Sequence, residues 1–311
     1  MEAKQIYVPI SQLATYINEN PYGTLSQVLV GLWMKIDFEG YSKKLIELEN
    51  QTGQSFKALT EWEQMLELGN RFGLDLRDRV KNSMKAECRS DLKRNQRAIL
   101  RDVNLIKVNT PDMIEKREKL ASLVTSFTNR GYGTHHENSA IDMYSSQTGF
   151  KITDQQRKVV KKVVTSQFPP VEWNLIGKID GMATQPNGEE ILVEIKNRTQ
   201  RLFGVLKDYE KVQIQSYLKL TGLNQGHLVE SLKINNSSST KTPYERERKI
   251  KIIPVTFEPA YWTETKRKLA GFVSFFGDFL KNDQLQEMVM HGCNKDGEGL
   301  LKNILDTYLK A

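Results

Sequence analysis

Residues 173–198 of the chain read WNLIGKIDGMATQPNGEEILVEIKNR. Two short runs in this stretch, 173–179 and 190–195, are rich in β-branched residues and are typical of strands. Between them, Pro186, Asn187 and Gly188 have the composition of a tight turn. The stretch therefore predicts two adjacent antiparallel strands joined by a hairpin turn.

Three charged side chains of this stretch are candidates for catalysis. Glu194 and Lys196 are two positions apart, so a strand would place both on one face. Asp180 follows the first strand, and pairing of the two strands would bring it toward Glu194. Two adjacent carboxylates hold a hard cation such as Mg²⁺ through oxygen ligands, and such an ion activates water and stabilises charge on a phosphate. Lys196 would then hold or polarise the attacking water.

The same three residues also have a plain structural interpretation. Asp180 would lie in a turn, and Glu194 and Lys196 would form the solvated face of an edge strand. Because D…ExK is a short and degenerate pattern, it does not decide between the two interpretations by itself. Gly177 and Gly181 on either side of the aspartate favour catalysis, since glycine would let a phosphate backbone approach closely.

Helices are expected on both sides of this stretch. Thr110 before Pro111 is a typical helix start, and Thr221 before Gly222 is a typical helix end. By apolar spacing and composition, the expected helices are 25–36, 56–68, 110–127, 208–220 and 260–280, the further strands are 158–160, 227–234 and 249–257, and a polar loop covers 235–242.

Two more motifs flank the hairpin. Gly133 and Glu137 form a GxxxE pattern, and Gln213 and Tyr217 form a QxxxY pattern that shares one helix face. With GxxxE, GxxD, ExK and QxxxY in this order, the chain resembles the RecB and phage lambda exonuclease branch of the PD-(D/E)xK nucleases, and within it the YqaJ-type viral recombinases. The similarity covers residues 1 to about 36 and 131 to about 280, and its N-terminal part consists of Ile10, Ser11, Leu13, Ala14, Asn20, Pro21, Tyr22 and Trp33.

The resemblance implies a fold and a metal site. The fold would be α/β, a PD-(D/E)xK restriction-endonuclease-like core in which a central mixed sheet is flanked by helices, with a helical N-terminal elaboration. Asp180 and Glu194 would be direct metal ligands, with the backbone carbonyl of Ile195 completing the shell and Glu137 near a second metal. The ions would be one or two Mg²⁺, for which Mn²⁺ substitutes.

The resemblance also implies roles for the remaining motif residues. Lys196 would be the catalytic lysine, and Gln213 and Tyr217 would orient the lysine, the water or the phosphate. An ordinary helix packed on the sheet is the alternative for the QxxxY pair. His135 and His136 are expected to have no metal role, because Mg²⁺ prefers oxygen ligands.

The implied activity is that of a Mg²⁺-dependent exonuclease that hydrolyses DNA phosphodiesters at DNA ends in viral or phage recombination or replication. An endonuclease with the same active site is one alternative, and a non-catalytic DNA-binding recombination accessory protein is another. The intact D…ExK and Glu137 argue against the accessory protein. The expected partners are double-stranded DNA with free ends, other copies of the chain in a homo-oligomer, and a single-strand annealing or replication protein.

Ser11 and Arg198 are expected to contact DNA by the same resemblance. Two features depart from the YqaJ pattern. Asn197 and Arg198 follow the lysine where the family usually has Cys-Pro, and the arginine that commonly precedes the serine motif is absent, with Lys4 the only nearby cation. Recognition of a terminal 5′-phosphate therefore stays open.

The composition agrees with a polyanionic partner in an intracellular compartment. Lys and Arg (45) outnumber Asp and Glu (38), giving a net charge of +7. Cys88 and Cys293 are too far apart in sequence for a metal-ligand spacing and cannot build a disulfide framework. The start of the chain does not read as a secretory signal, and no stretch approaches the roughly 20 apolar residues of a membrane span. The expected location is intracellular, and host cytoplasm or nucleus for a viral protein.

Residues 74–109 contain no Gly or Pro and predict one long amphipathic helix. Cations recur at every fourth position of this segment, at Arg77, Lys81, Lys85, Arg89, Lys93, Arg97 and Arg101. They are either the solvated rim of an apolar seam or a set of contacts to a phosphate backbone. The expected organisation is a helical region at 1–128 and a nuclease core with C-terminal helices at 129–311, with residues 1–36 joining the core in one compact unit.

Overall fold

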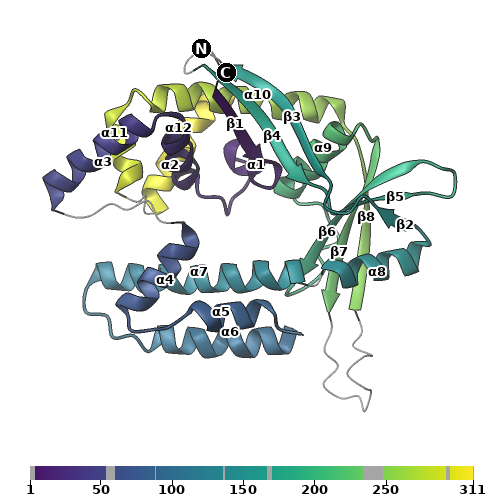
Figure 1. Ribbon diagram of the computed structural model, residues 1–311, viewed down its shortest axis with the longest axis horizontal. Helices are drawn as coiled ribbons and strands as arrows, with labels where there is room; N and C mark the ends of the chain where they lie inside the picture. Colours follow the sequence, from purple (N-terminus) through teal and green to yellow (C-terminus); the bar gives the residue numbers. More distant parts are fainter. Residues whose placement is uncertain are drawn as a thin grey trace.

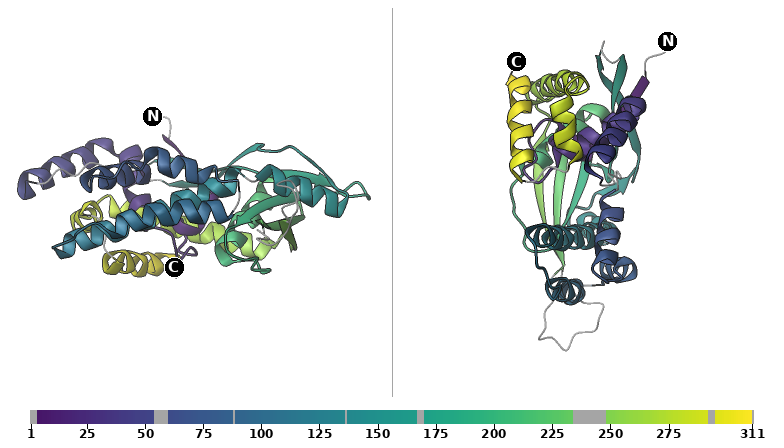
Figure 2. Two further views of the ribbon diagram at one scale, coloured as in Figure 1. Left: turned by 90° about the horizontal axis from the view of Figure 1, so that it is seen from below. Right: turned by 90° about the vertical axis from the view of Figure 1, so that its left-hand side faces the viewer.

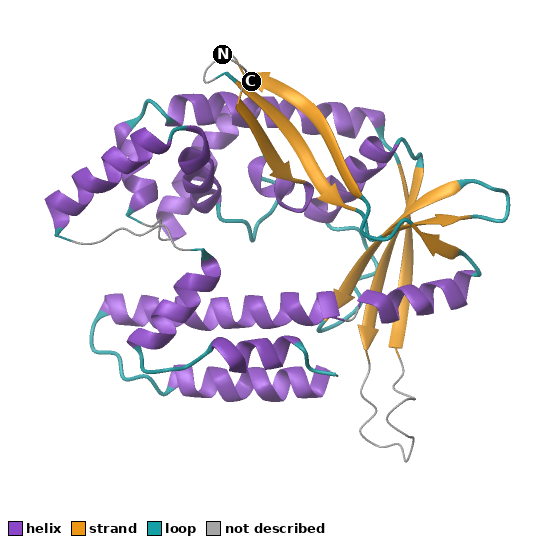
Figure 3. Cartoon of the chain, in the orientation of Figure 1, coloured by secondary structure: helices purple, strands orange, loops and turns teal. Residues whose placement is uncertain are grey.

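The computed structural model describes residues 4–53, 60–87, 89–135, 137–166, 170–233, 248–291 and 295–310. Helices surround two separate sheets, so the chain is an α/β protein as expected (Figures 1 and 3). In chain order the elements are β1 (Lys4–Pro9), α1 (Ile10–Tyr16), α2 (Leu25–Ile36), α3 (Phe38–Thr52), α4 (Glu61–Arg71), α5 (Arg77–Met84), α6 (Arg89–Asn104), α7 (Pro111–His135), α8 (Glu137–Thr148), β2 (Lys151–Thr153), β3 (Lys158–Ser166), β4 (Val171–Lys178), β5 (Gly181–Thr184), β6 (Glu190–Arg198), α9 (Asp208–Thr221), β7 (Gln225–Lys233), β8 (Arg248–Thr256), α10 (Pro259–Phe279), α11 (Asp283–Met290) and α12 (Lys295–Lys310).

Several helix boundaries follow the local signals in the sequence. Helix α2 has the expected bounds, and α7 starts at Pro111 with the Thr110 hydroxyl accepting from the Met113 amide at 3.2 Å. Helix α9 ends before Gly222, which has a φ of 79°. Helix α7 continues beyond the expected 127 to His135, so the boundary expected after residue 128 falls inside it. The loop expected at 235–242 lies outside the described residues.

The two sheets have different strand pairings. In the three-stranded sheet β1-β4-β3, β1 runs parallel to β4 and β3 runs antiparallel to it. In the five-stranded sheet β2-β5-β6-β7-β8, only β6 and β7 are parallel, so the sheet that carries the ExK motif is mixed. Helix α8, which begins with Glu137 of the GxxxE motif, and helix α9, which carries QxxxY, both contact strand β6.

The predicted pairing of the two quoted strands is wrong. Strands β4 and β6 lie in different sheets, and the antiparallel partner of β6 is the short strand β5 that follows Asp180. The hairpin turn itself is confirmed, with the Gly188 amide donating to the Gln185 carbonyl at 2.9 Å and a φ of 84° at Gly188. Residue composition predicts that a segment is extended, but which strands pair depends on what each face packs against.

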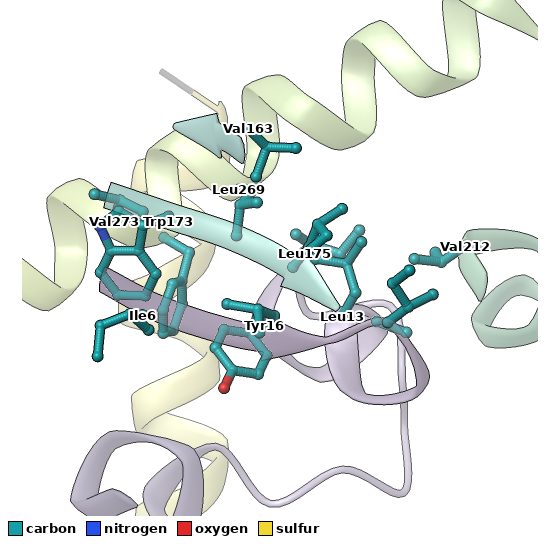
Figure 4. Close-up of a cluster of buried hydrophobic side chains, with 14 of the residues drawn as sticks. Ile6, Leu13, Tyr16, Val163, Trp173, Leu175, Val212, Leu269 and Val273 are labelled. Atoms are coloured by element: carbon teal, nitrogen blue, oxygen red, sulfur yellow. The ribbon is translucent and has the colours of Figure 1, made fainter. Parts of the chain in front are cut away.

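Strand β4 is held in its own sheet by the largest hydrophobic core. This core joins residues near the start of the chain, in β1, α1 and α2, to α9, α10 and α12 (Figure 4). The fully buried Trp173 of β4 packs edge-on against Phe272 and Phe276 of α10, with ring centroids 6.2 and 6.0 Å apart. Helix α10 thus closes the core, as predicted for 260–280.

The predicted single helix over 74–109 is two helices. Helix α5 ends at Met84 and α6 begins at Arg89, and both pack against α7 (Figures 1 and 2). Residues of α4 to α7, including Met65, Val80, Ile99 and Val124, form a separate hydrophobic core. Two shorter antiparallel helices can bury their apolar stripes against α7, whereas one continuous helix would carry half of its stripe away from that surface.

Gln96 of α6 also packs toward α7. The Gln96 side-chain amide donates to the hydroxyl of the fully buried Thr128 at 2.8 Å. Within the described residues, no helix is long and apolar enough to cross a membrane.

Candidate active site

Glu194, Lys196 and Gln213 form one hydrogen-bonded group. Strand β6 places Glu194 and Lys196 on one face, and the Lys196 ammonium donates to Glu194 Oε1 at 2.8 Å. Helix α9 contributes Gln213, whose Oε1 accepts from Lys196 and whose Nε2 donates to Glu194 Oε1, each at 2.8 Å. The amide therefore fixes the acid and the lysine relative to each other.

Asp180 joins this group from the connection between the two sheets. The chain leaves β4 at Lys178 and enters β5 at Gly181, so Asp180 lies between the strands rather than on one. Its Oδ2 accepts from the backbone amide of Ile195, on the strand of the ExK motif, at 2.7 Å. Burial, and then the nearby carboxylates of Glu194 and Glu137, raise the pKa of Asp180 well above its usual value.

The acidic groups fit a hard divalent cation. Glu194 is 3% exposed, and its Oε2 is buried without a hydrogen-bond partner. A buried carboxylate oxygen without a donor is costly unless a cation or water occupies the adjoining space. Among the described residues, no group of three or more His, Cys, Asp or Glu side chains is gathered in a metal-binding arrangement. Asp180 and Glu194 are close enough for the charge of Glu194 to raise the pKa of Asp180.

Glu137 lies at the edge of this acidic group. It is the first residue of α8, and its Oε1 accepts from the side chain of Gln156 at 2.8 Å. Burial raises the pKa of Glu137, and the charge of Glu194 adds to the rise. Gln156 belongs to no sequence motif, since it lies in the connection between β2 and β3, and only the tertiary structure brings it to Glu137.

Lys196 remains positively charged in this surrounding. Burial alone would lower the pKa of its ammonium, but the carboxylates of Glu194 and Asp180 outweigh that effect, so the pKa is raised. A protonated lysine can donate to a water or a phosphate oxygen but cannot accept a proton. The arrangement therefore suits Lys196 to positioning and charge stabilisation.

Tyr217 acts on the backbone next to Asp180. Its hydroxyl donates to the carbonyl oxygen of Lys178 at 3.0 Å, and its ring lies against Gly177, where an added Cβ would come within 2.6 Å of the ring. At Gly181 an added Cβ would collide with the side chain of Ile152. Both glycines are thus required by packing within the protein.

Arg198 has a role that differs from the expected DNA contact. Its guanidinium, with the side chain 11% exposed, forms ion pairs with Glu210 at 2.7 Å and with Glu230 at 2.6 Å. Both carboxylates are almost fully buried, so the arginine neutralises two internal charges. The neighbouring Asn197 donates to the Gly133 carbonyl at 2.8 Å and joins β6 to the end of α7.

Ser11 lies near the end of strand β4 that leads to Asp180. Strand β1 pairs in parallel with β4, with Pro9 opposite Ile176, so α1 begins beside the strand end that leads to Asp180. Ser11 is exposed in the first turn of α1. Lys4 is at the other end of β1, where its ammonium donates to the Ile36 carbonyl at 2.9 Å.

The predicted row of cations is divided between two helices. Arg77 and Lys81 belong to α5 and Lys85 follows it, whereas Lys93, Arg97 and Arg101 share one face of α6. Arg94 also lines that face, although the every-fourth spacing omits it, and it forms an ion pair with Asp91 at 3.1 Å. The α6 face is therefore a more coherent cationic surface than the full predicted row. The side chain of Arg89 lies outside the described parts of the chain.

The raised pKa of Asp180 predicts a pH dependence of stability. Because the folded protein holds this proton more tightly than the unfolded chain, the stabilisation is present below the unfolded value near 3.8 and is lost as the pH rises through the folded value. In metal-free protein the contribution of Asp180 to stability is therefore expected to fall as the pH rises above about 4, and Asp180→Asn is expected to remove this fall. Denaturant unfolding in a chelator at several pH values measures it, and parallel pH profiles for the two proteins would contradict the assignment.

No family model matches the chain, and no curated protein matches it. Among solved structures, it is similar to an alkaline exonuclease from Laribacter hongkongensis, with 14% identity, a TM-score of 0.34, and coverage of 66% of this chain and 94% of that one. The same exonuclease in complex with dAMP gives 14% identity, a TM-score of 0.30, and coverage of 65% and 87%. A phage-related exonuclease from Haemophilus somnus gives 10% identity, a TM-score of 0.35, and coverage of 89% and 96%. The chain itself is an α/β protein whose mixed sheet, flanked by helices, presents Glu194 and Lys196 beside Asp180.

Proposed function

We propose that the protein is a metal-dependent deoxyribonuclease of the PD-(D/E)xK superfamily, acting as an exonuclease on DNA ends in viral or phage recombination or replication. The observation that carries the proposal is the group formed by Asp180, Glu194 and Lys196, in which Glu194 Oε2 is buried without a partner. Such a combination of acids and a charged lysine matches the needs of phosphodiester hydrolysis.

Asp180 and Glu194 would hold Mg²⁺, with the Ile195 carbonyl as a further ligand and Glu137 near a second ion. When bound, the ion would supply acidification of water and neutralisation of charge at the phosphate. Lys196 would donate to the attacking water or to a phosphate oxygen, because its ammonium stays charged beside Glu194. Gln213 would hold both side chains in this geometry through its two hydrogen bonds.

Incubation with linear duplex DNA labelled at either end, beside a closed circular plasmid, tests the proposal. With Mg²⁺ or Mn²⁺ we expect progressive loss of end label and an intact circle. Ca²⁺ should support binding with little turnover, because its larger radius and looser coordination place water and phosphate poorly. Excess EDTA should stop cleavage.

Other outcomes of this assay would indicate a different function or mechanism. Nicking of the closed circle would mean that the protein is an endonuclease with the same active site and not an exonuclease. Binding of DNA without cleavage in any metal would support a recombination accessory protein. Full activity in excess EDTA would exclude the metal mechanism.

The cationic face of α6 is proposed to contact the DNA backbone away from the active site. Each neutralised phosphate releases counterion, so the logarithm of the binding constant falls by about 0.9 per contact with the logarithm of salt concentration. Replacing Lys93, Arg97 and Arg101 together with Gln is expected to reduce that slope by roughly two to three units and to weaken binding to all sequences alike.

A salt titration of binding to a fixed duplex in Ca²⁺ measures this change. The matched control replaces three exposed lysines on other helices with Gln, namely Lys35 of α2, Lys43 of α3 and Lys266 of α10. If the control and the α6 variant flattened the slope equally, general charge rather than the α6 face would account for binding. An unchanged slope in the α6 variant would mean that these cations form a solvated helix face and do not contact DNA.

A further inference from the structure

Aromatic and cationic side chains gather around the start of helix α9, beside the candidate active site. We call this surface the aromatic–cationic patch, and it consists of Tyr22, Arg201, Phe203, Lys207 and Tyr209. Residues 199–207 connect strand β6, which carries Lys196, to helix α9, which carries Gln213. The patch is therefore attached to both elements of the lysine–glutamine pair.

Tyr22 is presented to solvent by a fixed turn. The Tyr22 backbone amide donates to the side chain of Asn20 at 3.0 Å, and the Gly23 amide donates to the Asn20 carbonyl at 3.1 Å. The tyrosine is 82% exposed, and its ring meets Tyr209 edge-on with centroids 6.1 Å apart. An exposed ring on a turn with its own hydrogen bonds offers a flat apolar surface at little cost in conformational entropy.

Two cationic side chains lie close to the ring of Phe203 in the same region. The Lys207 ammonium lies 4.6 Å from the centre of the ring and the Arg201 guanidinium 5.3 Å from it. Within the described residues, neither cation forms an ion pair, whereas the nearby Arg198 is neutralised by two buried carboxylates. Cation–π contacts thus hold two charges side by side without an acid to compensate them.

The connection that carries Phe203 is itself fixed. The Gly204 amide donates to Glu230 Oε2 at 2.6 Å, with a φ of 72° that favours glycine. Arg198, which pairs with the same glutamate, lies 4.9 Å from the centre of the Phe203 ring. Burial, followed by the charge of Glu210, raises the pKa of Tyr209, while Arg198 and Lys196 oppose the rise, so Tyr209 lies within electrostatic reach of the candidate catalytic lysine.

We propose that the aromatic–cationic patch binds single-stranded DNA, with Tyr22 stacking on an unpaired base and Arg201 and Lys207 contacting the flanking phosphates. Exposed rings next to uncompensated cations match the two faces of a single strand, since every base has a π-face and every linkage a charge. Bases inside a duplex are already stacked and cannot use such a ring. The inference deepens the proposed nuclease function, because the bound strand would be the one that runs to or from the active site.

Fluorescence anisotropy in EDTA tests the inference without relying on cleavage. The probes are an oligothymidylate of about 12 nucleotides and an abasic strand of the same length and charge. We expect Tyr22→Ala to weaken binding of oligothymidylate by about 5- to 30-fold and to leave binding of the abasic strand unchanged, because only the stacking contact is lost. Tyr22→Phe, which keeps the ring, should bind like the wild type.

A matched control and a second variant separate stacking from charge. Tyr7→Ala removes a 44% exposed tyrosine from β1 and should leave both probes unaffected. Replacing Arg201 and Lys207 with Gln should weaken both probes alike and reduce the salt dependence by about 1.4, since each single-strand contact contributes about 0.7. The inference would be overturned if Tyr22→Ala bound oligothymidylate like the wild type, weakened both probes equally, or if the wild type bound neither probe.

The inference and the proposed function fail in distinguishable ways. If Tyr22→Ala had no effect on oligothymidylate binding while the protein cleaved DNA normally with Mg²⁺, the patch would be rejected as a binding surface and the proposed nuclease function would stand. If Tyr22→Ala weakened oligothymidylate binding as expected but the wild type cleaved no DNA, the patch would stand as a single-strand binding surface and the proposed nuclease function would be rejected.

Discussion

Replacing Glu194 with Gln, or Lys196 with Met, is expected to slow DNA cleavage by about 10²- to 10⁴-fold. Glu194→Gln removes the charge of the carboxylate whose Oε2 has no hydrogen-bond donor, so the site would lose affinity for a divalent cation. Lys196→Met keeps the length of the side chain but removes the ammonium that lies 2.8 Å from Glu194 Oε1 and from Gln213 Oε1. Single-turnover cleavage of end-labelled duplex in saturating Mg²⁺ measures both effects.

The matched control for these variants lies on the same strand. Glu190→Gln removes an exposed carboxylate at the start of β6, four positions before Glu194, and should cleave like the wild type. Binding of duplex DNA in Ca²⁺ by each variant, with an unchanged circular dichroism spectrum, would show that the loss concerns chemistry rather than folding. Wild-type rates in either Glu194→Gln or Lys196→Met would rule out the proposed active site.

Replacing Arg198 with Met is expected to destabilise the protein by about 3–5 kcal/mol. Arg198 is the shared partner of Glu210, 2% exposed, and Glu230, fully buried. Without the guanidinium, two carboxylates would remain in the interior close together and without a cation, although Glu230 would keep its bond from the Gly204 amide. Chemical denaturation followed by tryptophan fluorescence measures the loss, because Trp173 lies in the core that includes α9.

Two further variants determine whether charge is the cause. Arg198→Met combined with Glu210→Gln and Glu230→Gln removes all three charges and should recover much of the stability, since replacement of a whole buried ionic group is far less costly than loss of one partner. Arg157→Met breaks an exposed ion pair with Asp154 and should cost no more than about 1 kcal/mol. Equal losses for Arg198→Met and Arg157→Met would mean that the buried group has no special weight.

The Arg198 group also explains how the candidate catalytic residues keep their positions. Arg198 comes two residues after Lys196 on β6, Glu210 comes one turn before Gln213 on α9, and Glu230 lies on β7. The ion pairs therefore connect the strand and the helix that present the lysine–glutamine pair. An arginine in this place is suited to the task because its planar fork can bind two carboxylates at once.

The sequence by itself determined the features that depend on neighbouring residues. The apolar spacing of 25–36 and the Thr110-Pro111 start are local signals, and both mark true helix boundaries. The Pro186–Gly188 turn and the two-residue spacing of Glu194 and Lys196 are equally local, so the hairpin turn and the shared face of the ExK motif follow directly. The α/β class with helices beside a mixed sheet was implied by the family resemblance, which rests on the order of the motifs along the chain.

The tertiary structure alone decided features that depend on distant residues. A β-branched run does not specify its partner, so β4 pairs with β1 near the start of the chain rather than with β6. The segment 74–109 turns back on itself because both of its halves pack on α7. Arg198 lies inside the protein because it pairs with carboxylates 12 and 32 positions away in the sequence. Gly177 is required because the ring of Tyr217 lies against it. In each case the deciding free energy belongs to a contact between segments that local sequence signals do not relate to each other.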